Sequence, residues 1–204
     1  MNNKNNRREF LKKTTLFAFA VSTPVLNSCR GDNPAKTPEE TCVTTPDILG
    51  PFYKAGAPFK EDISASSSAT PLIMEGRVLK DCDTVLPGAI VEIWNADENG
   101  SYDISTEFKF RGQCQTQQNG MYRFKTIIPG RYLNGNTYRP SHIHFRITAP
   151  GYGELVSQVY FKDDPFINGD PWASTAKASE RILIVKRNID GMDTVNFDIY
   201  LKPV

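Results

Sequence analysis

The chain has 204 residues, of which 39% are hydrophobic and 11% aromatic, a composition that suits one packed domain and argues against a disordered chain. Its formal net charge of +1 carries no electrostatic footprint of a nucleic-acid or acidic partner. The chain contains 2 histidines, and both lie in the tripeptide 142–144, so this pair calls for a chemical explanation.

The first 28 residues predict an export signal. A polar, basic stretch that ends in Arg7 and Arg8 is followed by an apolar run over 16–26, which is too short and too interrupted to span a membrane. The paired arginines and the apolar residues after them resemble a twin-arginine export signal. An ordinary secretory signal that contains two arginines is the alternative.

Residues 26–29, Leu-Asn-Ser-Cys, resemble a bacterial lipobox, in which Cys29 would become the lipid-bearing residue. Residues 29–45 then predict a flexible tether that leads to one domain at 46–204. We therefore expect an exported protein, periplasmic or on the cell surface, that is anchored to a bacterial membrane through Cys29. A cleaved, free protein without Cys29 is the alternative.

Export also changes how the remaining cysteines are interpreted. Cys42, Cys82 and Cys114 would lie in an oxidising compartment, where disulfides persist. Three thiols allow one bridge and leave one thiol over. A bridge between Cys42 and Cys82 is preferred, although the sequence leaves the other pairings open.

From Pro71 onward the chain consists of short alternating runs separated by Gly, Pro, Asn and Asp, which predict β-strands. The expected strands are residues 72–79, 89–94, 121–127, 143–148, 155–161, 181–186 and 195–201. The last of these alternates with a period of two, and a turn at Asp190-Gly191 precedes it. At most a short helix is expected, near residues 171–178. The pattern predicts a single-domain, all-β fold, a β-sandwich, and a prealbumin-like sandwich without catalytic function would share most of it.

His142 and His144 occupy positions i and i+2 of an expected strand, so their side chains project from the same face, while Ile143 projects from the other. Two imidazoles on a rigid strand can bind one metal ion; surface or hydrogen-bonded histidines are the alternative. A zinc hydrolase or a ferrous oxygenase would need a third histidine or a carboxylate near the pair, and neither has an obvious supplier. What lies upstream is Tyr102 and Tyr132, each at a turn after a strand.

Six segments carry a more specific pattern, in which both tyrosines precede an Arg-Pro-x-His-x-His run. They are residues 50–53, 92–97, 100–102, 110–112, 126–132 and 139–145. In this order the segments resemble the intradiol ring-cleavage dioxygenases, the family of protocatechuate, catechol and hydroxyquinol dioxygenases. The resemblance implies a ferric ion, Fe(III), bound by four side chains, those of Tyr102, Tyr132, His142 and His144. Tyr132 would be the ligand that leaves when substrate binds.

The chemistry of the donors agrees with this ligand set, because phenolates are hard anionic donors that favour iron(III) over iron(II). The resemblance further implies that Arg139 stabilises negative charge on the substrate and that Gln158 lies near an iron-bound hydroxide. The alternatives are a structural ion pair for Arg139 and a cross-strand partner for Gln158. Tyr53 either lines the substrate entrance or belongs to a structural turn, and Arg111 and Trp94 are expected to pack.

The implied activity is cleavage of an ortho-dihydroxylated aromatic ring, between the two hydroxyl-bearing carbons, by O2. The main alternative is a non-catalytic, prealbumin-like binding module on the cell surface. From the sequence we expect no long helical N-terminal segment of the kind that builds the dimer of the catechol enzymes. The resemblance therefore leaves open both the oligomeric state and the choice among catechol, protocatechuate, hydroxyquinol and larger lignin-like phenols.

Overall fold

The computed structural model describes residues 42–64 and 67–204. The predicted export signal at 1–28, Cys29 and most of the predicted tether lie outside the described residues. In the part of the chain that is described, no helix has the length and apolar character needed to cross a membrane.

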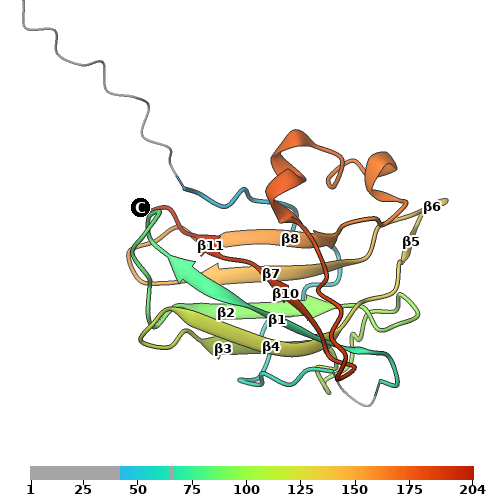
Figure 1. Ribbon diagram of the computed structural model, residues 1–204, viewed down its shortest axis with the longest axis horizontal. Helices are drawn as coiled ribbons and strands as arrows, with labels where there is room; N and C mark the ends of the chain where they lie inside the picture. The colour runs from blue at the N-terminus through green and yellow to red at the C-terminus, as the bar shows by residue number, and fades with distance from the viewer. Residues whose placement is uncertain (1–41, 65–66) are drawn as a thin grey trace, which may run out of the picture. The chain divides into compact units, whose positions relative to one another are not determined.

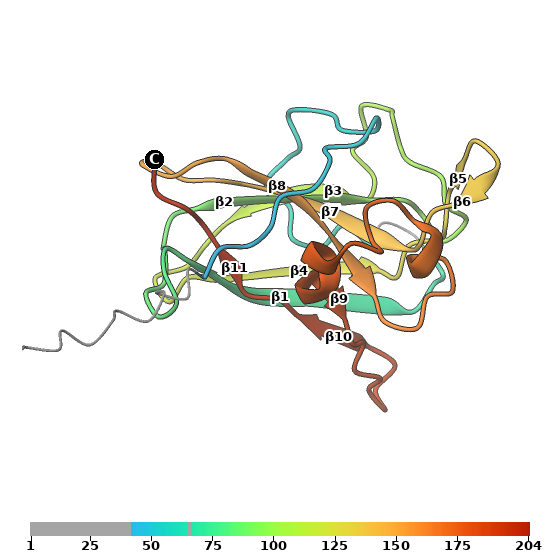
Figure 2. The same ribbon diagram turned by 90° about the horizontal axis from the view of Figure 1, so that it is seen from above.

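Two β-sheets pack face to face (Figures 1 and 2). The five-stranded sheet has the order β3-β2-β7-β8-β9, and in the second sheet β1 pairs with β4 on one side and with β10 and β11 on the other. The strands of the five-stranded sheet are β2 (Ile90–Asn95), β3 (Arg111–Gln115), β7 (His142–Thr148), β8 (Leu155–Phe161) and β9 (Ile182–Leu183). Those of the second sheet are β1 (Pro71–Leu79), β4 (Met121–Ile127), β10 (Asp193–Asn196) and β11 (Ile199–Tyr200). A small hairpin, β5 (Leu133–Asn134) with β6 (Thr137–Tyr138), and two 3-10 helices, η1 (Ile167–Gly169) and η2 (Ala176–Arg181), are the other elements within the described residues.

Burial of alternate side chains fixes which face of each strand meets the core. On β7, Ile143, Phe145 and Ile147 are fully buried between the sheets. Each such side chain stabilises the fold by about 1.5–3 kcal/mol, and a shift of one residue would turn all three outward. His142 and His144 are therefore held on the outer face of the five-stranded sheet.

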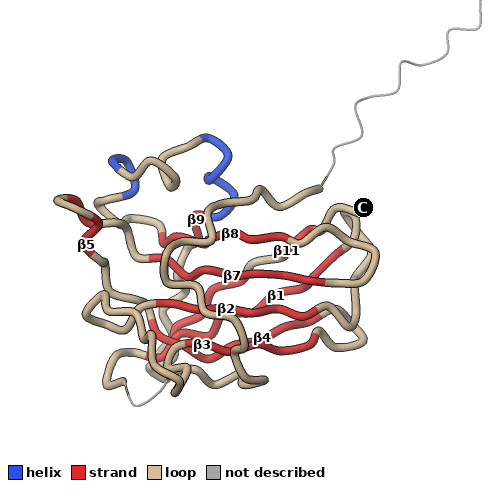
Figure 3. The backbone as a smooth tube through the Cα atoms, turned by 180° about the vertical axis from the view of Figure 1, so that it is seen from behind, coloured by secondary structure: helices blue, strands red, loops and turns tan. Residues whose placement is uncertain are grey.

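The N-terminal segment, residues 42–64, crosses that outer face (Figure 3). Its Asp47 N–H donates to Val156 O on β8 at 2.9 Å, and its Lys60 N–H donates to Gln113 O on β3 at 3.0 Å. The outer face of the five-stranded sheet is thus covered by chain, although it is the face that a sandwich usually exposes to water.

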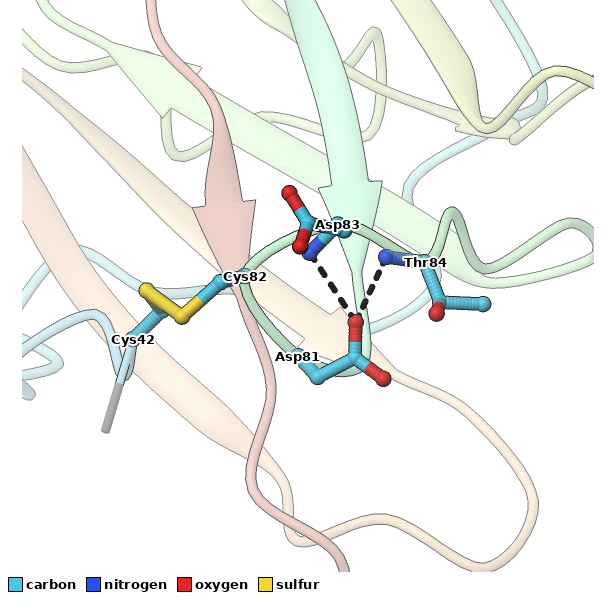
Figure 4. Close-up of a disulfide and its surroundings, with 5 residues drawn as sticks. All are labelled: Cys42, Asp81, Cys82, Asp83 and Thr84. Atoms are coloured by element: carbon cyan, nitrogen blue, oxygen red, sulfur yellow. Dashed lines mark hydrogen bonds between the residues drawn. A yellow bond between two sulfur atoms is a disulfide. The ribbon is translucent and has the colours of Figure 1, made fainter. Parts of the chain in front are cut away.

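A disulfide joins Cys42, at the start of the N-terminal segment, to Cys82 in the loop after β1 (Figure 4). In that loop, Asp81 Oδ1 accepts the N–H groups of two following residues. The preferred pairing is confirmed, and Cys114 is free and buried, which raises the pKa of its thiol to about 12. The predicted tether, 29–45, overlaps the domain, because residue 42 is already bonded to the loop after β1.

The all-β sandwich predicted from the sequence is confirmed, and five of the expected strands lie within one residue of their observed limits. The expected strand at 195–201 is instead divided into β10 and β11. Asp198 Oδ1 accepts the N–H of Arg77 at 2.8 Å, so a side chain replaces the backbone partner that a continuous strand would offer β1.

The predicted limits of two other elements were wrong, and one strand was missed. The expected strand at 181–186 shortens to β9, and Lys186 makes an isolated bridge to Thr194 in the other sheet. The helix expected near 171–178 is replaced by η2, which begins at residue 176 and follows the 3-10 pattern. Strand β3 was not predicted, because its inward positions are Gly112 and Cys114, which give a weak hydrophobic signal.

Candidate active site

The register of the five-stranded sheet places polar side chains in rows on its outer face. His144 stands opposite Trp94 on β2 and opposite Gln158 on β8, and His142 stands opposite Tyr160. Directly opposed residues of antiparallel strands project to the same side. The expectation that both histidines share one face is met, and Gln158 stands next to them.

The two tyrosines come from different loops that pack against each other. Tyr102 follows β2 and Tyr132 follows β4, and glycines mark the point of contact between the loops. A Cβ atom on Gly130 would lie 2.4 Å from the backbone nitrogen of Gly100, closer than real Cβ atoms approach. The Gly130 N–H also donates to Asp97 O at 2.8 Å. The glycines before each tyrosine thus let the two loops meet.

All four expected ligand side chains converge. The ring centroids of Tyr102 and Tyr132 are 5.7 Å apart, and those of His142 and His144 are 5.0 Å apart. Between the two pairs, the Tyr132 and His142 rings are 5.7 Å apart, and Tyr102 Oη lies 3.0 Å from His142 Nε2. The structure therefore brings together residues that are 40 positions apart in the sequence.

Aromatic rings and a glycine support the ligands from behind. Phe52 stacks on Tyr102 with centroids 4.5 Å apart, and Trp94 stacks on His144 at 4.8 Å, with interplanar angles of 10° and 6°. Gly50 has a φ of +76°, and a Cβ atom there would lie 2.8 Å from His144 Cε1. The imidazole of His144 is thus packed against the backbone of the N-terminal segment.

Arg111 and Trp94 are buried and pack, as expected from the sequence, and Tyr53 packs against Trp94. The Arg111 guanidinium is buried and donates two hydrogen bonds to Asp103 O, at 3.0 and 2.9 Å, which hold the loop that carries Tyr102. Tyr53 lies against Trp94 and donates to Glu92 at 3.3 Å. Packing by these residues therefore positions the candidate ligands.

Arg139 and Gln158 lie beside the four rings, and Arg139 Nη1 donates to Gln158 Oε1 at 3.3 Å. Both residues belong to a buried polar network whose other members were not predicted from the sequence, namely Asp47, Tyr160, Asp170 and Arg181. Asp47 and Arg181 are 134 positions apart, so no local pattern joins them.

The histidines are held in the form that binds metals. Burial and the nearby charge of Arg139 lower the pKa of His142 to about 4, and burial together with His142 lowers the pKa of His144. His142 Nδ1 donates to Pro140 O at 2.7 Å, so its Nε2 carries the lone pair that faces Tyr102. Both imidazoles are neutral at neutral pH, as metal ligands must be.

The phenol of Tyr102 can become an anionic ligand only beside a cation. Burial, and then the proximity of Tyr132, raise the pKa of Tyr102 above its ordinary value near 10, so the phenol stays protonated unless a positive charge binds beside it. Within residues 42–64 and 67–204, no three His, Cys, Asp or Glu side chains form a group that could hold a metal. Two imidazole nitrogens with two phenolate oxygens make a hard, doubly anionic donor set, which fits iron(III).

A family model described as a dioxygenase matches residues 48–203. A 6-chlorohydroxyquinol 1,2-dioxygenase from Cupriavidus pinatubonensis (strain JMP 134 / LMG 1197) is 29% identical over 97% of this chain and 75% of its own length. This chain belongs to the intradiol ring-cleavage dioxygenase family. Its members are enzymes, which favours catalysis over a non-catalytic binding module.

Other members of the family are similar to parts of this chain. The intradiol ring-cleavage dioxygenase prcA of Aspergillus niger (strain ATCC MYA-4892 / CBS 513.88 / FGSC A1513) is 30% identical over 74% of this chain and 60% of its own length. A solved structure, the dioxygenase domain of a dioxygenase–carbohydrate-binding protein fusion from Streptomyces sp. SirexAA-E, has a TM-score of 0.71 and 29% identity over 79% of this chain and 99% of that domain. Catechol 1,2-dioxygenase from Acinetobacter radioresistens shares the fold with a TM-score of 0.72, at 24% identity over 79% of this chain and 63% of that chain.

Proposed function

We propose that this chain cleaves an ortho-dihydroxylated aromatic ring between its two hydroxyl-bearing carbons with O2, using iron(III) bound by four side chains, those of Tyr102, Tyr132, His142 and His144. The observation that carries the proposal is the convergence of these four rings from one strand and two loops, with Tyr102 Oη 3.0 Å from His142 Nε2. Two phenols and two neutral imidazoles that meet in this way form a set of oxygen and nitrogen donors suited to a metal ion.

When bound, a ferric ion supplies the Lewis acidity and the redox chemistry that ring cleavage by O2 requires. The protein supplies proton acceptance and charge. As a phenolate, Tyr132 Oη can accept a proton from a substrate hydroxyl, and the positive charge of Arg139, which interacts electrostatically with Tyr132, stabilises that anion. Phe52 packs on both tyrosine rings, at 4.5 and 5.5 Å, and keeps water from that side of them.

Arg139 has a second use in this proposal. Its guanidinium is buried beside the ligands, where water does not screen its charge, so it can stabilise negative charge that develops on the ring being cleaved. Gln158, which stands opposite His144, supports the position of Arg139 through its side-chain oxygen.

The proposed substrates are catechol-type rings. The similar enzymes named above act on 6-chlorohydroxyquinol and catechol, and both rings carry adjacent hydroxyl groups. Two oxygen atoms on adjacent carbons can chelate one metal ion, which a monophenol cannot do.

We also propose that the enzyme is exported and is held at a bacterial membrane through a lipid on Cys29. The arginine pair at 7 and 8 and the Leu-Asn-Ser-Cys run at 26–29 support export and lipidation. The disulfide between Cys42 and Cys82 is consistent with an oxidising compartment.

The test is spectroscopic and chemical. Phenolate bound to iron(III) gives an intense visible charge-transfer band, so the purified, iron-loaded protein should be coloured, and a catechol-type substrate should shift the band. Oxygen uptake and product mass, measured over a panel of catechols, should give one O2 consumed and a ring-opened diacid. Tyr132→Phe and Tyr102→Phe should each alter the band. A protein that stays colourless after reconstitution with iron would overturn the proposed site.

A further inference from the structure

Arg139 is held on several sides by residues other than the four candidate ligands. Its Nε donates to Asp170 Oδ2 at 2.7 Å and its Nη2 to Asp170 Oδ1 at 3.2 Å, so the pair is bidentate. The guanidinium also lies 4.3 Å from the centre of the Trp172 ring. The side chains of Arg139 and Asp170 are 3% and 2% exposed, so water replaces none of these contacts.

Gln158 is held in the same way from the opposite side. Its Nε2 donates to Ile48 O at 3.1 Å and approaches Asp47 Oδ1 at 3.4 Å, both in the N-terminal segment. With its nitrogen turned toward that segment, its oxygen must face Arg139. The amide of Gln158 therefore has one orientation.

Tyr160 links the two halves of this network. Its hydroxyl donates to Asp47 Oδ2 at 2.9 Å and accepts from Arg139 Nη2 at 3.3 Å. Asp47 is in turn paired with Arg181 at 2.8 Å, and the side chains of that pair are 3% and 2% exposed. The network thus contains two buried ion pairs, each of one arginine and one aspartate, and a tyrosine and a glutamine connect the two pairs. The two positive and two negative charges balance.

We propose that Asp170 and Asp47 are positioning residues for the ring-cleavage reaction: they clamp Arg139 and Gln158 in the single orientation that the reaction uses. This inference rests on the proposed function. Arg139 has five N–H donors, and four of them are taken by Asp170, Tyr160 and Gln158. These three partners leave one N–H donor of Arg139, and Tyr132 is among the groups that interact electrostatically with the guanidinium.

A role in stability alone does not explain this network. Replacing buried ion pairs by well-packed apolar side chains is often neutral or stabilising, so stability does not require charges here. The network also lies directly beside the candidate ligands, because Gln158 stands opposite His144 and Tyr160 stands opposite His142 on the same face of the sheet. A group whose charge acts on a reacting ring needs rigid support of this kind.

Asp170→Asn tests the inference, with Asp193→Asn as its matched control. Asp193 is a buried aspartate, 3% exposed, that pairs with an arginine, Arg187, but lies on β10 of the other sheet. In the iron-loaded enzyme, Asp170→Asn should lower kcat by about 10²-fold, the effect of a misplaced group, with KM and iron content unchanged. Asp193→Asn should lower the Tm without lowering kcat. Asp170→Glu, which keeps the charge, should recover part of the lost kcat.

A second measurement needs neither iron nor turnover. In the metal-free protein, the Nε–H of Arg139 should give a nuclear magnetic resonance signal that exchanges slowly with solvent. Tyr160→Phe, which removes one hydroxyl and keeps the ring, should speed that exchange, and in the loaded enzyme it should lower kcat by up to about tenfold, the effect of one hydrogen bond.

The two proposals fail in different ways. An enzyme without a visible band or ring cleavage, in which the Arg139 signal is nevertheless protected, would refute the proposed function and leave the clamp intact. An active enzyme in which Asp170→Asn and Tyr160→Phe keep the wild-type kcat, or lose no more than Asp193→Asn does, would overturn the clamp. Unprotected exchange at Arg139 in the wild-type protein would do the same.

Discussion

Gly50→Ala perturbs one imidazole of the candidate site through the backbone. Gly50 has a φ of +76°, and a Cβ atom there would lie 2.8 Å from His144 Cε1 and 3.3 Å from its Nε2. Trp94 stacks on the same imidazole at 4.8 Å, so the ring has little room to retreat. We expect the alanine to push His144 away from the other three ligands.

Two separable costs follow from this substitution. A non-glycine residue with positive φ costs about 1–2 kcal/mol, which in a domain of this size corresponds to a Tm lower by roughly 2–8 °C. The contact with His144 adds a displacement of several tenths of an ångström, because a gap of 2.8 Å must open toward an ordinary contact. Metal sites tolerate only about 0.2 Å of error in ligand distances, so this displacement should weaken iron binding.

Gly151→Ala isolates the first cost from the second. Gly151 has a φ of +82°, and a Cβ atom there would have nothing within 4 Å. In thermal unfolding followed by circular dichroism, Gly151→Ala should lose only the stability that the positive φ costs, and Gly50→Ala should lose at least as much. Iron content and the visible band should fall only in Gly50→Ala. If Gly50→Ala binds iron as tightly as Gly151→Ala does, then His144 is not a ligand or does not lie where the structure has it.

Three further outcomes are expected. Replacing Cys42 and Cys82 together with alanine should lower the free energy of unfolding by about 4 kcal/mol, the value for a disulfide across a separation of 40 residues, while iron-loaded protein keeps its visible band; denaturant titration measures the loss. The metal-free protein should lose stability as pH falls from about 6.5 to about 4, with about 3 kcal/mol from His142 alone, because the pKa of His142 is lowered to about 4 and the unfolded chain binds the proton first. The pKa of His144 is lowered as well, so His142→Gln should reduce this pH dependence and leave the part that is due to His144. Cys29→Ala should move the enzyme from the membrane fraction to the soluble fraction without loss of activity, and a variant that stays with the membrane would contradict the lipid anchor.

The sheet strands could be predicted from the sequence where inward side chains are large and apolar. In β7, Ile143, Phe145 and Ile147 alternate with polar residues, and the strand lies within one residue of the expected limits. The same rule missed β3, whose inward side chains are small. Strand prediction thus depended on how much apolar area each strand buries.

The two histidines could be predicted as candidate ligands from a local signal, because they are the two in the chain and share one strand. Tyr102 and Tyr132 lie at turns after strands, and it was the resemblance to a known family, not a local pattern, that implied them as ligands. The clamp carries no such signal. Asp170 and Asp47 are two of 23 acidic residues, and nothing local marks which of them will be buried beside an arginine.

The N-terminal segment explains why the usual rule for alternating strands, that polar side chains face solvent, does not hold on the outer face of the five-stranded sheet. Polar residues that alternate with apolar ones are normally assigned to solvent, and by that rule Gln158 would be exposed. It is instead fully buried, because residues 42–64 cross the face and hydrogen-bond its side chain. In β7 and β8 the alternation therefore separates core from site, and what makes the site dry is a segment without strand signals of its own. A charge that acts on a substrate without screening by water requires such a cover. Residues 42–64, which carry no strand signal in the sequence, are therefore necessary to keep water from Arg139.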